Sequence, residues 1–334
     1  MINVGIIGFG YWGPNLVRNF NALDNCKVIA VADARPERLK LVEKTYPSVQ
    51  CLQHADDLLN SSQVDAVIIA TPVFTHFELA KKALENGKHV LLEKPMASSV
   101  AESEQLIDLA ARKNLLLMVD HTFLYTGAVQ KMKTLIDSKA IGNLSYIDST
   151  RINLGLLQPD INVLWDLAPH DLAILLYLNN LKPYSINATG ISHTKNGIEN
   201  IAYLTVNYQE NFIAHFNCSW TSPVKLRTFL VGGTEKMLVY NDLEPAEKLR
   251  IYDSGFDVKD QDDRLKLMVE YRTGDIHIPQ VSLHEALREM ANDFIQSIVE
   301  MKIPRSSSSL GLEVIRILEA SQRSLKQGGK EILL

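Results

Sequence analysis

Three glycines near the amino terminus constrain the fold more than any other feature of this sequence. Residues 2–7 (INVGII) predict a buried strand, and residues 8–13 (GFGYWG) then spell GxGxxG. Leu16, Val17 and Phe20 follow at helical spacing. The motif therefore lies between a strand and a helix, which is the context in which its glycines have a physical role.

Each glycine of this motif has its own function. Gly8 allows a tight turn, Gly10 lets a pyrophosphate approach the backbone, and Gly13 lets the helix pack closely on the strand. Residues 27–32 (KVIAVA) predict a second strand, which ends at Asp33, 20 residues after Gly13. An acidic residue there accepts hydrogen bonds from an adenosine ribose, while the free N–H groups of the helix attract the pyrophosphate. The sequence predicts dinucleotide binding; a glycine turn without a ligand is the alternative.

The residues around Asp33 bear on the choice of dinucleotide. The Asp33 carboxylate repels a 2′-phosphate, which favours NAD over NADP. Arg35 follows two residues later and offers a compensating positive charge. We therefore expect NAD and keep NADP open.

Strands and helices alternate through residue 120, which predicts an α/β domain with a doubly wound parallel sheet. The expected strands are 2–7, 27–32, 64–70, 89–95 and 115–120, and the expected helices are 36–46, 75–86 and 100–113. We expect Thr75 to cap the second of these helices and Gly87 to close it.

The pattern changes near residue 121, where long alternating segments replace the βα repeats. The expected strands are 144–154, 184–192, 201–208, 212–219, 226–232, 236–241 and 249–252, and the expected helices are 127–138, 165–178, 283–300 and 310–327. This predicts an α+β domain with a large, mostly antiparallel open sheet. We place the dinucleotide-binding domain at 1–121 and the second domain at 122–334.

Composition excludes several function classes. The chain has 334 residues, 46% of them hydrophobic, with a net charge of −5. This charge does not favour nucleic acid or a membrane surface as partner, and no apolar run reaches the ~20 residues of a membrane helix. The three cysteines (Cys26, Cys51, Cys218) have no zinc-ligand spacing. We expect free thiols, no metal site and a cytoplasmic location.

Glu93-Lys94-Pro95 is the first of three polar clusters that could carry chemistry. It ends an apolar strand, and ligands of open α/β sheets bind at that edge. A lysine in a partly dry cleft can donate a proton or hold a substrate hydroxyl. A solvated loop lysine is the alternative.

The second cluster is WDLAPHD, residues 165–171. Asp166 and His170 are four residues apart and share a helix face. A carboxylate near an imidazole suits it to acid–base work near neutral pH. A helix capped by Asp166, with His170 in the core, is the alternative, and Pro169 should weaken the helix or mark its first turn.

The third cluster is HTFLY, residues 121–125, where the chain crosses between the domains. Such a position often lines a cleft, although an ordinary domain junction explains it equally well. His76 stands near a helix start and is compatible with a cap, a surface position or a cofactor contact.

Four segments in this order resemble the Gfo/Idh/MocA oxidoreductases: GFGYWG (8–13), ATPVFTH (70–76), GKHVLLEKP (87–95) and WDLAPHD (165–171). The resemblance covers essentially the whole chain and implies a Rossmann domain followed by a substrate-binding domain. It also implies NAD or NADP as cofactor, and Pro95 is often cis in the family.

The resemblance implies roles for individual residues. Cofactor contacts are expected from Gly8, Phe9, Gly10, Tyr11, Trp12, Gly13, Asp33, Ala34, Arg35, Thr71, Pro72, His76, Glu93, Lys94 and Pro95. Catalysis is expected from Lys94, Asp166 and His170, and substrate contacts from His121, Tyr125, Arg151, Trp165 and His170.

A narrower resemblance concerns the substrate. YWGPNLVRNF (11–20), HTFLY (121–125), the segment 149–171 and the segment 312–331 are similar to nucleotide-sugar 3-dehydrogenases of surface-polysaccharide synthesis. These act on UDP-N-acetylglucosamine or its uronate. One departure is Thr126-Gly127-Ala128, where the resemblance implies Asn-Pro-Ala.

Other functions remain open at this point. Within dehydrogenases the main rival substrates are myo-inositol and a free aldose; a NAD-dependent glycosidase and a non-catalytic nucleotide-binding regulator are further alternatives. One domain cannot cover both partly apolar faces of the second sheet. We therefore expect a homodimer or homotetramer that pairs through that sheet.

Overall fold

Two sheets organise the chain, one parallel and one mostly antiparallel. The computed structural model describes residues 1–155, 157–158, 160–258 and 269–334. It divides into two compact units, one of Met1–Thr126 with His284–Glu319 and one of Gly127–Leu283 with Ala320–Leu334. The predicted fold class, a doubly wound parallel sheet plus a large mostly antiparallel sheet, is confirmed.

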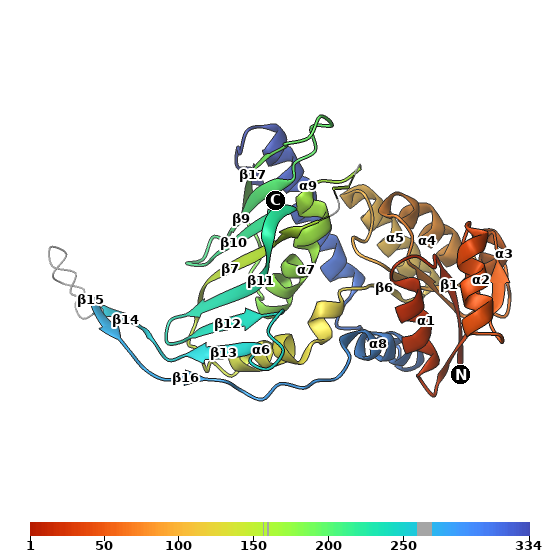
Figure 1. Ribbon diagram of the computed structural model, residues 1–334, viewed down its shortest axis with the longest axis horizontal. Coiled ribbons are helices and arrows are strands. Elements are labelled where there is room, and N and C mark those ends of the chain that lie inside the picture. Colours follow the sequence, from red (N-terminus) through yellow and green to blue (C-terminus); the bar gives the residue numbers. More distant parts are fainter. Residues whose placement is uncertain (156, 159, 259–268) are drawn as a thin grey trace. The chain divides into compact units, whose positions relative to one another are not determined.

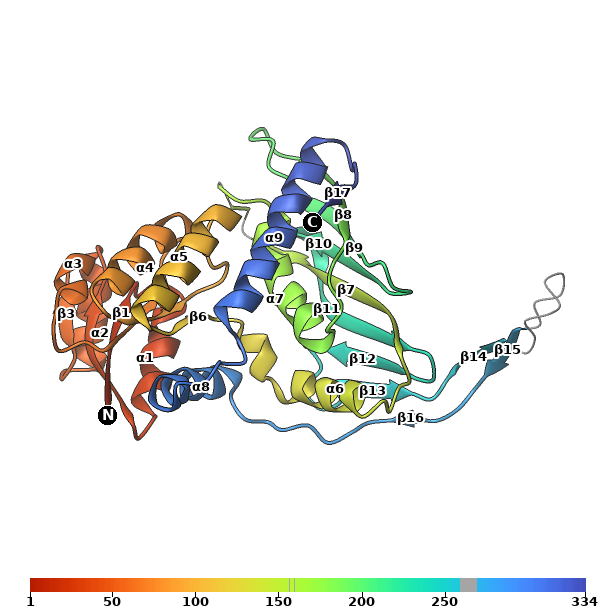
Figure 2. The same cartoon turned by 180° about the vertical axis from the view of Figure 1, so that it is seen from behind.

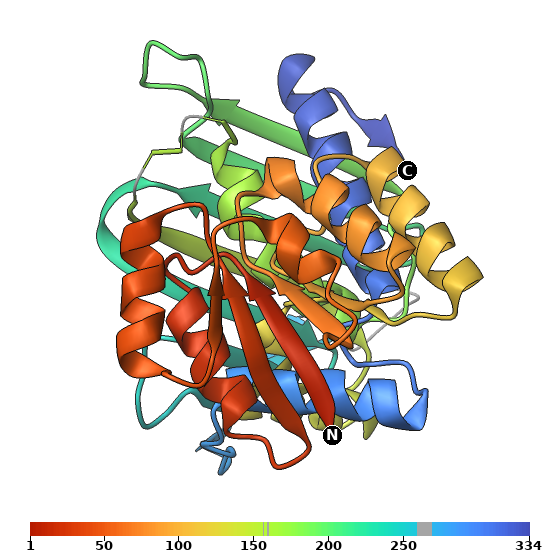
Figure 3. The same cartoon turned by 90° about the vertical axis from the view of Figure 1, so that its right-hand side faces the viewer.

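The first unit contains a six-stranded parallel sheet in the order β3-β2-β1-β4-β5-β6. Its strands are β1 (Ile2–Ile7), β2 (Cys26–Ala32), β3 (Gln50–Leu52), β4 (Ala66–Ile69), β5 (His89–Leu92) and β6 (Leu117–Val119). Figure 3, in which this unit faces the viewer, shows β1 at the front. All four residues of β4 are buried, as expected of a strand with both faces covered.

Six helices that lie wholly in this unit and two short 3₁₀ turns flank this sheet in the described part of the chain. They are α1 (Gly13–Asn21), α2 (Pro36–Thr45), α3 (Ala55–Leu59), α4 (His76–Glu85), α5 (Val100–Lys113) and α8 (Ala286–Glu300), with short 3₁₀ turns η1 (Val73–Thr75) and η2 (Thr122–Tyr125). Helices α4 and α5 pack side by side, and α1 packs against α8 (Figures 1 and 2). The sequence did not predict β3 and α3, which are too short to show a periodicity.

Residues 284–319 belong to the first unit, whereas the expected division at 121/122 assigned them to the second domain. Phe294 of α8 packs edge-on against Phe20 of α1, with ring centroids 6.2 Å apart. Arg18 Nη1 also donates to Glu285 Oε2 at 2.9 Å. The chain thus returns to the first unit after β16, and its last residues then rejoin the second unit, which a division by sequence order does not reveal.

The second unit contains a nine-stranded sheet in the order β16-β13-β12-β11-β7-β10-β9-β8-β17. All seven predicted strands are present, and the complete set is β7 (Leu144–Leu154), β8 (Ser185–Ile191), β9 (Ile201–Asn207), β10 (Ile213–Ser219), β11 (Thr221–Gly233), β12 (Met237–Asn241), β13 (Leu249–Tyr252), β16 (Ile276–His277) and β17 (Ile332–Leu333). β10 pairs with β7 in parallel, and the other described pairs are antiparallel. β14 (Gly255–Val258) and β15 (Val269–Arg272) form a separate two-stranded sheet.

One face of the nine-stranded sheet is covered by α6 (Gly127–Asp137) and α7 (Val163–Leu178), as Figure 2 shows. Burial alternates along the strands, so Leu204 and Phe216 point toward the helices and are buried. On the opposite face Tyr146, Tyr203 and Ile213 are 39%, 46% and 47% exposed. The second unit therefore carries a partly apolar sheet face that its own helices leave uncovered.

Two residues near helix starts differ from what the sequence analysis expected, Thr75 in its hydrogen bonding and Gly127 in its identity. Thr75 occupies the N-cap position of α4 as predicted, but its side chain makes no capping bond; its hydroxyl donates instead to the carbonyl of Pro72 at 2.8 Å. Gly87 closes α4 as predicted, with φ at +74°. Gly127 must be a glycine, because a Cβ there would lie 2.1 Å from the carbonyl oxygen of Ser282.

The cysteines and helix lengths agree with the composition. Cys26, Cys51 and Cys218 are free thiols, as predicted. Within the described ranges of the chain, no helix has the length and apolar character that crossing a membrane requires.

The contact between α1 and α8 provides a test of the first unit's boundary. Phe294→Ala should lower the free energy of unfolding by about 3–5 kcal/mol, since it removes a fully buried ring. Val299→Ala on the same helix, where the side chain is 61% exposed, should cost under ~0.5 kcal/mol. Urea unfolding of both variants measures the difference; equal costs would show that α8 is not part of this core.

Candidate functional site

The glycine loop after β1 combines a strained turn with open space. Gly8 has φ at +97°, and a Cβ there would lie 2.4 Å from the carbonyl oxygen of Ala70. A Cβ on Gly13 would lie 2.9 Å from Cδ2 of Phe9. Among the described residues, a Cβ on Gly10 would have one neighbour within 4 Å outside the adjacent residues, Arg35 Nη2 at 3.8 Å. The fold itself requires glycine at positions 8 and 13, whereas at position 10 it leaves room for a ligand beside the backbone.

Asp33 follows β2 and is 7% exposed. Its carboxylate accepts from the backbone N–H groups of Phe9 (2.7 Å) and Arg35 (2.9 Å), and from Nε and Nη2 of Arg35 (both 2.9 Å). Burial alone would raise the pKa of Asp33, but the Arg35 guanidinium and these N–H groups outweigh it and hold the pKa below its usual value. Asp33 therefore stays ionised and can accept hydrogen bonds from ribose hydroxyls.

A cavity of about 610 Å³ lies along this edge of the parallel sheet. It is lined by Ile7, Gly8, Gly10, Ala32, Asp33, Ala34, Arg35, Gln53, Ala55, Ala70, Thr71, Pro72, Thr75 and Leu79. Seven of the predicted cofactor residues are in this set. Gln53, Ala55, Thr75 and Leu79 also line the cavity and were not predicted as cofactor residues. Thr75 lies in the ATPVFTH segment, and Gln53 directly follows β3, a strand that the sequence did not predict. The cavity fits the adenosine end of a dinucleotide.

The aromatic residues of the glycine motif are on the surface. Tyr11 is 83% exposed and Trp12 is 47% exposed, with their rings edge to face at 5.3 Å. Neither lines the cavity of the adenosine end, and their predicted cofactor contact stays a prediction.

His76 connects two loops at this edge. It is 1% exposed, which excludes the surface position considered from the sequence. Its Nδ1 lies 2.9 Å from the carbonyl oxygen of Pro95, and its Nε2 lies 2.9 Å from that of Thr71. The Lys94–Pro95 peptide is cis, as the resemblance implies. His76 therefore holds together two of the loops assigned to the cofactor.

Four ionisable residues gather where β5 and β6 end. Glu93 and Asp120 each follow the last residue of their strand, and Leu92 pairs with Val119 in register, so the two acids are neighbours. Burial, reinforced by the charge of Asp120, raises the pKa of Glu93 to about 8. Burial likewise raises the pKa of Asp120 to about 6. The motifs had not pointed to Asp120, although an acid at the carboxyl end of a parallel strand is a readable signal.

His121 lies beside this pair and is 1% exposed. Burial and the nearby positive charge of Lys94 lower the pKa of His121 to about 3, so the ring is neutral. Neither ring nitrogen has a hydrogen-bond partner in the described ranges. A buried polar atom without a partner is costly to the folded protein, so this ring needs an explanation beyond packing.

Tyr125 is buried and fully engaged within the first unit. Its hydroxyl donates to Asp293 Oδ2 at 2.7 Å and accepts from the backbone N–H of Ser306 at 3.2 Å. The Arg305 guanidinium lies 4.6 Å from its ring centroid. Tyr125 thus ties η2 to α8, and its expected substrate contact stays a prediction.

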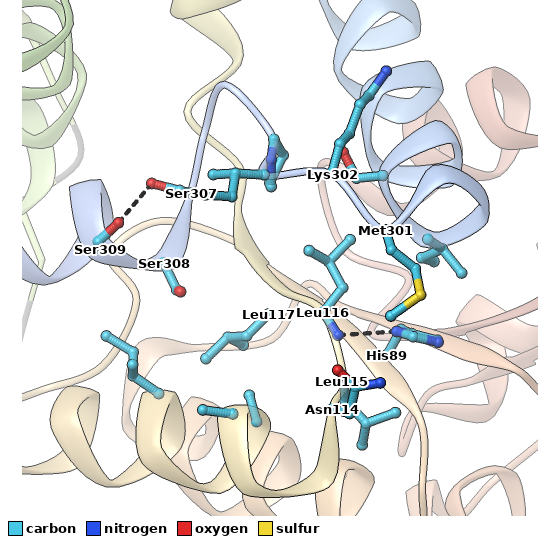
Figure 4. A pocket seen from close by; sticks show the side chains of 17 residues that line it. His89, Asn114, Leu115, Leu116, Leu117, Met301, Lys302, Ser307, Ser308 and Ser309 are labelled. Atoms are coloured by element: carbon cyan, nitrogen blue, oxygen red, sulfur yellow. Dashed lines mark hydrogen bonds between the residues drawn. The ribbon is translucent and has the colours of Figure 1, made fainter.

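A second cavity in this unit lies at the opposite edge of the sheet. It measures about 590 Å³ and lies by the amino ends of β5 and β6, where Leu116 N–H donates to His89 Nδ1 at 2.9 Å (Figure 4). Ser307 and Ser309 join their hydroxyls at 2.9 Å on another wall. None of the predicted site residues lines it.

In the second unit, α7 carries the predicted acid–base pair. The helix begins at Val163, and Asn162 caps it by accepting from the N–H groups of Leu164 (3.1 Å) and Trp165 (3.2 Å). The alternative in which Asp166 is the cap is therefore wrong. Pro169 lies inside the helix rather than at its first turn. Asp166 lies in the first turn, one turn before His170.

Asp166 and His170 are half-buried, and their neighbours on α7 are more enclosed. Asp166 Oδ2 accepts from Trp220 Nε1 at 3.0 Å. Trp165 is 6% exposed, and its Nε1 has no hydrogen-bond partner in the described part of the chain. The half-buried carboxylate of Asp166, the half-buried imidazole of His170 and the buried indole of Trp165 thus lie within two turns of α7.

Arg151 forms a buried ion pair. Its Nη2 and Nε donate to Asp171 Oδ1 and Oδ2 at 2.6 and 2.8 Å, and Ser149 Oγ donates to the same carboxylate at 2.9 Å. The Arg151 side chain is 4% exposed. Its predicted substrate contact stays a prediction; the structure gives it the additional role of anchoring α7 to β7 through Asp171, which the motifs did not reveal.

No group of three or more His, Cys, Asp or Glu side chains in the described ranges could hold a metal ion.

The space beside Gly10 gives a prediction for cofactor binding. Gly10→Ala should leave the melting temperature within about 2 °C, since nothing in the protein obstructs the new methyl group. The affinity for NAD should fall at least about tenfold, because the methyl group occupies the ligand's place. Calorimetric titration and melting measure the two effects. Gly8→Ala is the contrasting variant and should lose stability; unchanged NAD affinity in Gly10→Ala would contradict the assignment.

The raised pKa of Glu93 predicts a pH effect on stability. The protonated acid is favoured in the folded state, so its contribution is complete below the unfolded pKa of 4.5 and is lost as pH rises through about 8. Relative to Glu93→Gln, the wild-type free energy of unfolding should fall by roughly 2–4 kcal/mol from pH 5 to pH 8.5. Urea unfolding at both pH values measures this, with exposed Glu78→Gln as control. Parallel curves for wild type and Glu93→Gln would contradict it.

Two stretches of the chain match known family models. Residues 2–121 match the model of the oxidoreductase family with NAD-binding Rossmann fold, and residues 129–239 match the GFO/IDH/MocA C-terminal domain. The UDP-N-acetylglucosamine 3-dehydrogenase of Acidithiobacillus ferrooxidans is 30% identical over 199 residues, 57% of this chain and 58% of that protein. Its structure covers 98% of both chains with a TM-score of 0.81 at 23% identity.

Two further relatives widen the range. An oxidoreductase structure from Magnetospirillum magnetotacticum is 27% identical, with a TM-score of 0.82 over 96% of this chain and 99% of its own. The scyllo-inositol 2-dehydrogenase (NADP(+)) of Bacillus subtilis is 26% identical over 62% of this chain and 60% of its own. The matched stretches span 38% to 58% of the first curated relatives' length. The two family models and the shared fold show that this chain belongs to the Gfo/Idh/MocA oxidoreductase family, with an NAD-binding Rossmann domain at residues 2–121.

Proposed function

We propose that this protein is a NAD-dependent dehydrogenase that oxidises a sugar carbinol, at C3 of a UDP-N-acetylhexosamine or its uronate. The observation that carries the proposal is the cluster of Glu93, Lys94, Asp120 and His121 at the carboxyl ends of β5 and β6. This is the sheet edge that also holds the glycine loop and Asp33. A lysine among buried acids next to the dinucleotide site supports proton and hydride chemistry there.

The chain's own residues would bind the reactants and move the proton. When bound, NAD supplies the hydride acceptor at its nicotinamide ring. His170 takes the proton of the substrate hydroxyl. Lys94 donates a hydrogen bond to the same oxygen and stabilises the negative charge that develops there. Asp166 orients the substrate or the imidazole.

The unpartnered buried groups support this assignment. His121 and Trp165 were both assigned to the substrate from the sequence, and both have ring nitrogens without a partner in the described ranges. A sugar offers hydroxyl groups that would satisfy them. Such groups cost stability in the free protein and gain affinity when the ligand binds.

The substrate class rests on the relatives and on the narrower sequence resemblance. One relative is a UDP-N-acetylglucosamine 3-dehydrogenase, and another is a scyllo-inositol 2-dehydrogenase that uses NADP(+). Because of the second relative, a polyol or free-aldose dehydrogenase is the second candidate. A cytoplasmic location fits the proposed small-molecule substrate.

The absorbance of reduced nicotinamide tests the proposal. The purified protein is incubated with NAD and, separately, with UDP-N-acetylglucosamine, its uronate, myo-inositol and glucose. A rise with a UDP-sugar alone supports the proposal, and a rise with inositol or glucose alone supports the second candidate. No rise with any of them leaves a tightly held cofactor, the glycosidase or the regulator, and mass spectrometry of the denatured protein for bound NAD(H) comes next. No rise from protein without retained NAD(H) contradicts both candidates.

Lys94→Ala should abolish turnover and spare NAD binding. The ammonium group acts on the substrate oxygen, whereas the dinucleotide is held chiefly by the glycine loop and Asp33. Steady-state rates and NAD titration measure the two effects, with Lys113→Ala on the surface of α5 as control. Normal turnover by Lys94→Ala would remove the residue from the mechanism.

We also propose that the protein forms a homodimer or homotetramer through the open face of the nine-stranded sheet. Tyr146, Tyr203 and Ile213 leave apolar surface exposed there. Solution scattering should show a dimer or tetramer at micromolar concentration, and Ile213→Glu should shift it toward monomer because a charge enters the interface. A wild-type monomer would contradict the proposal.

A further inference from the structure

The indole of Trp220 is locked in place by the backbone around it. Trp220 joins β10 to β11 and is 3% exposed. The backbone N–H of Trp220 donates to the backbone carbonyl of Asn200 at 3.0 Å, and the backbone carbonyl of Trp220 accepts from the backbone N–H of Gly155 at 2.9 Å. A Cβ on Gly155 would lie 2.7 Å from Cδ1 of the indole, so the glycine leaves space for the ring. The direction of the Trp220 Nε1–H bond is therefore fixed.

This fixed donor points at the carboxylate of Asp166. The distance from Trp220 Nε1 to Asp166 Oδ2 is 3.0 Å. A buried indole N–H usually has an acceptor, and a bond to an ionised carboxylate is stronger than one between neutral groups. Trp165, the adjacent residue on α7, has an Nε1 without a partner in the part of the chain that the structure describes. Two buried indoles in this unit therefore differ: the Nε1 of Trp220 has Asp166 as its acceptor, whereas the Nε1 of Trp165 has no acceptor among the described residues.

Asp166 needs such a constraint for the role proposed for it. It lies in the first turn of α7 and is half-buried, and the bond from Trp220 restricts the rotation of its carboxylate. A misplacement of about 1 Å in a reacting group costs on the order of a hundredfold in rate.

We propose that Trp220 is a positioning residue: its indole fixes the Asp166 carboxylate in the orientation that the reaction uses. The inference rests on the proposed function for the use of that carboxylate, but not for the contact. Trp220 does not touch the reacting atoms, and it acts through Asp166 alone.

Indole ¹⁵N–¹H spectra test the contact without any substrate. The chain has three tryptophans, so three indole signals are expected, and Trp220→Phe identifies the one that belongs to Trp220. That signal should lie downfield in the wild type and move upfield in Asp166→Asn, because an amide oxygen is a weaker acceptor than a carboxylate. The signal should not move in Tyr177→Phe. Tyr177 lies on α7 like Asp166, and this variant loses a hydrogen bond from α7 to Gln130. A Trp220 signal that ignores Asp166→Asn would overturn the proposal.

Kinetics test the consequence of the contact. With any sugar that the wild type oxidises, Trp220→Phe should lower kcat about 10- to 100-fold while KM changes less than about threefold and NAD affinity is retained. Tyr177→Phe should keep the wild-type kcat. A kcat within threefold of wild type in Trp220→Phe would overturn the positioning role. If the wild type oxidises none of the sugars, the proposed function fails, and the spectra still decide whether Trp220 holds Asp166.

Discussion

Parallel pairing of the six-stranded sheet is the constraint on which the rest of the candidate site depends. Because all six strands run in one direction, their carboxyl ends meet at one edge. Gly8, Asp33, Glu93 and Asp120 are each the first residue after a strand, namely β1, β2, β5 and β6. Residues up to 112 positions apart in sequence therefore share one edge without any contact having to be specified between their segments. The chemistry of this edge follows from what each strand end carries.

Two carboxylates at this edge show how the same group acquires opposite properties. Asp33 accepts four hydrogen bonds from N–H groups, two of them from a guanidinium, and its pKa is lowered. Glu93 is half-buried next to a second acid, and its pKa is raised to about 8. The first stays ionised, and the second takes up a proton near neutral pH. In the second unit a third solution appears, since Asp171 is paired with Arg151 and serves to hold α7.

The sequence predicted the elements whose signal is local. Each long strand and helix has a periodicity of its own, and the GxGxxG motif places its turn. β3 and α3 are too short for such a signal, and the Asn162 cap competes with an equally suitable Asp166 four residues later. The remaining misses are contacts across long sequence separations. Residues 284–319 return to the first unit through Phe294 and Phe20, and Trp220 reaches Asp166 across 54 positions. No periodicity or spacing encodes these contacts.

We propose that this protein moves a hydride from a sugar carbinol carbon to NAD. The most direct test of this proposal is a single-turnover reaction with UDP-N-acetylglucosamine that carries deuterium on C3, followed by mass spectrometry of the nicotinamide product. We predict that the reduced cofactor gains one deuterium while the sugar loses it. A reduced cofactor without deuterium, or a label that remains on the sugar or passes to water, would contradict oxidation at C3.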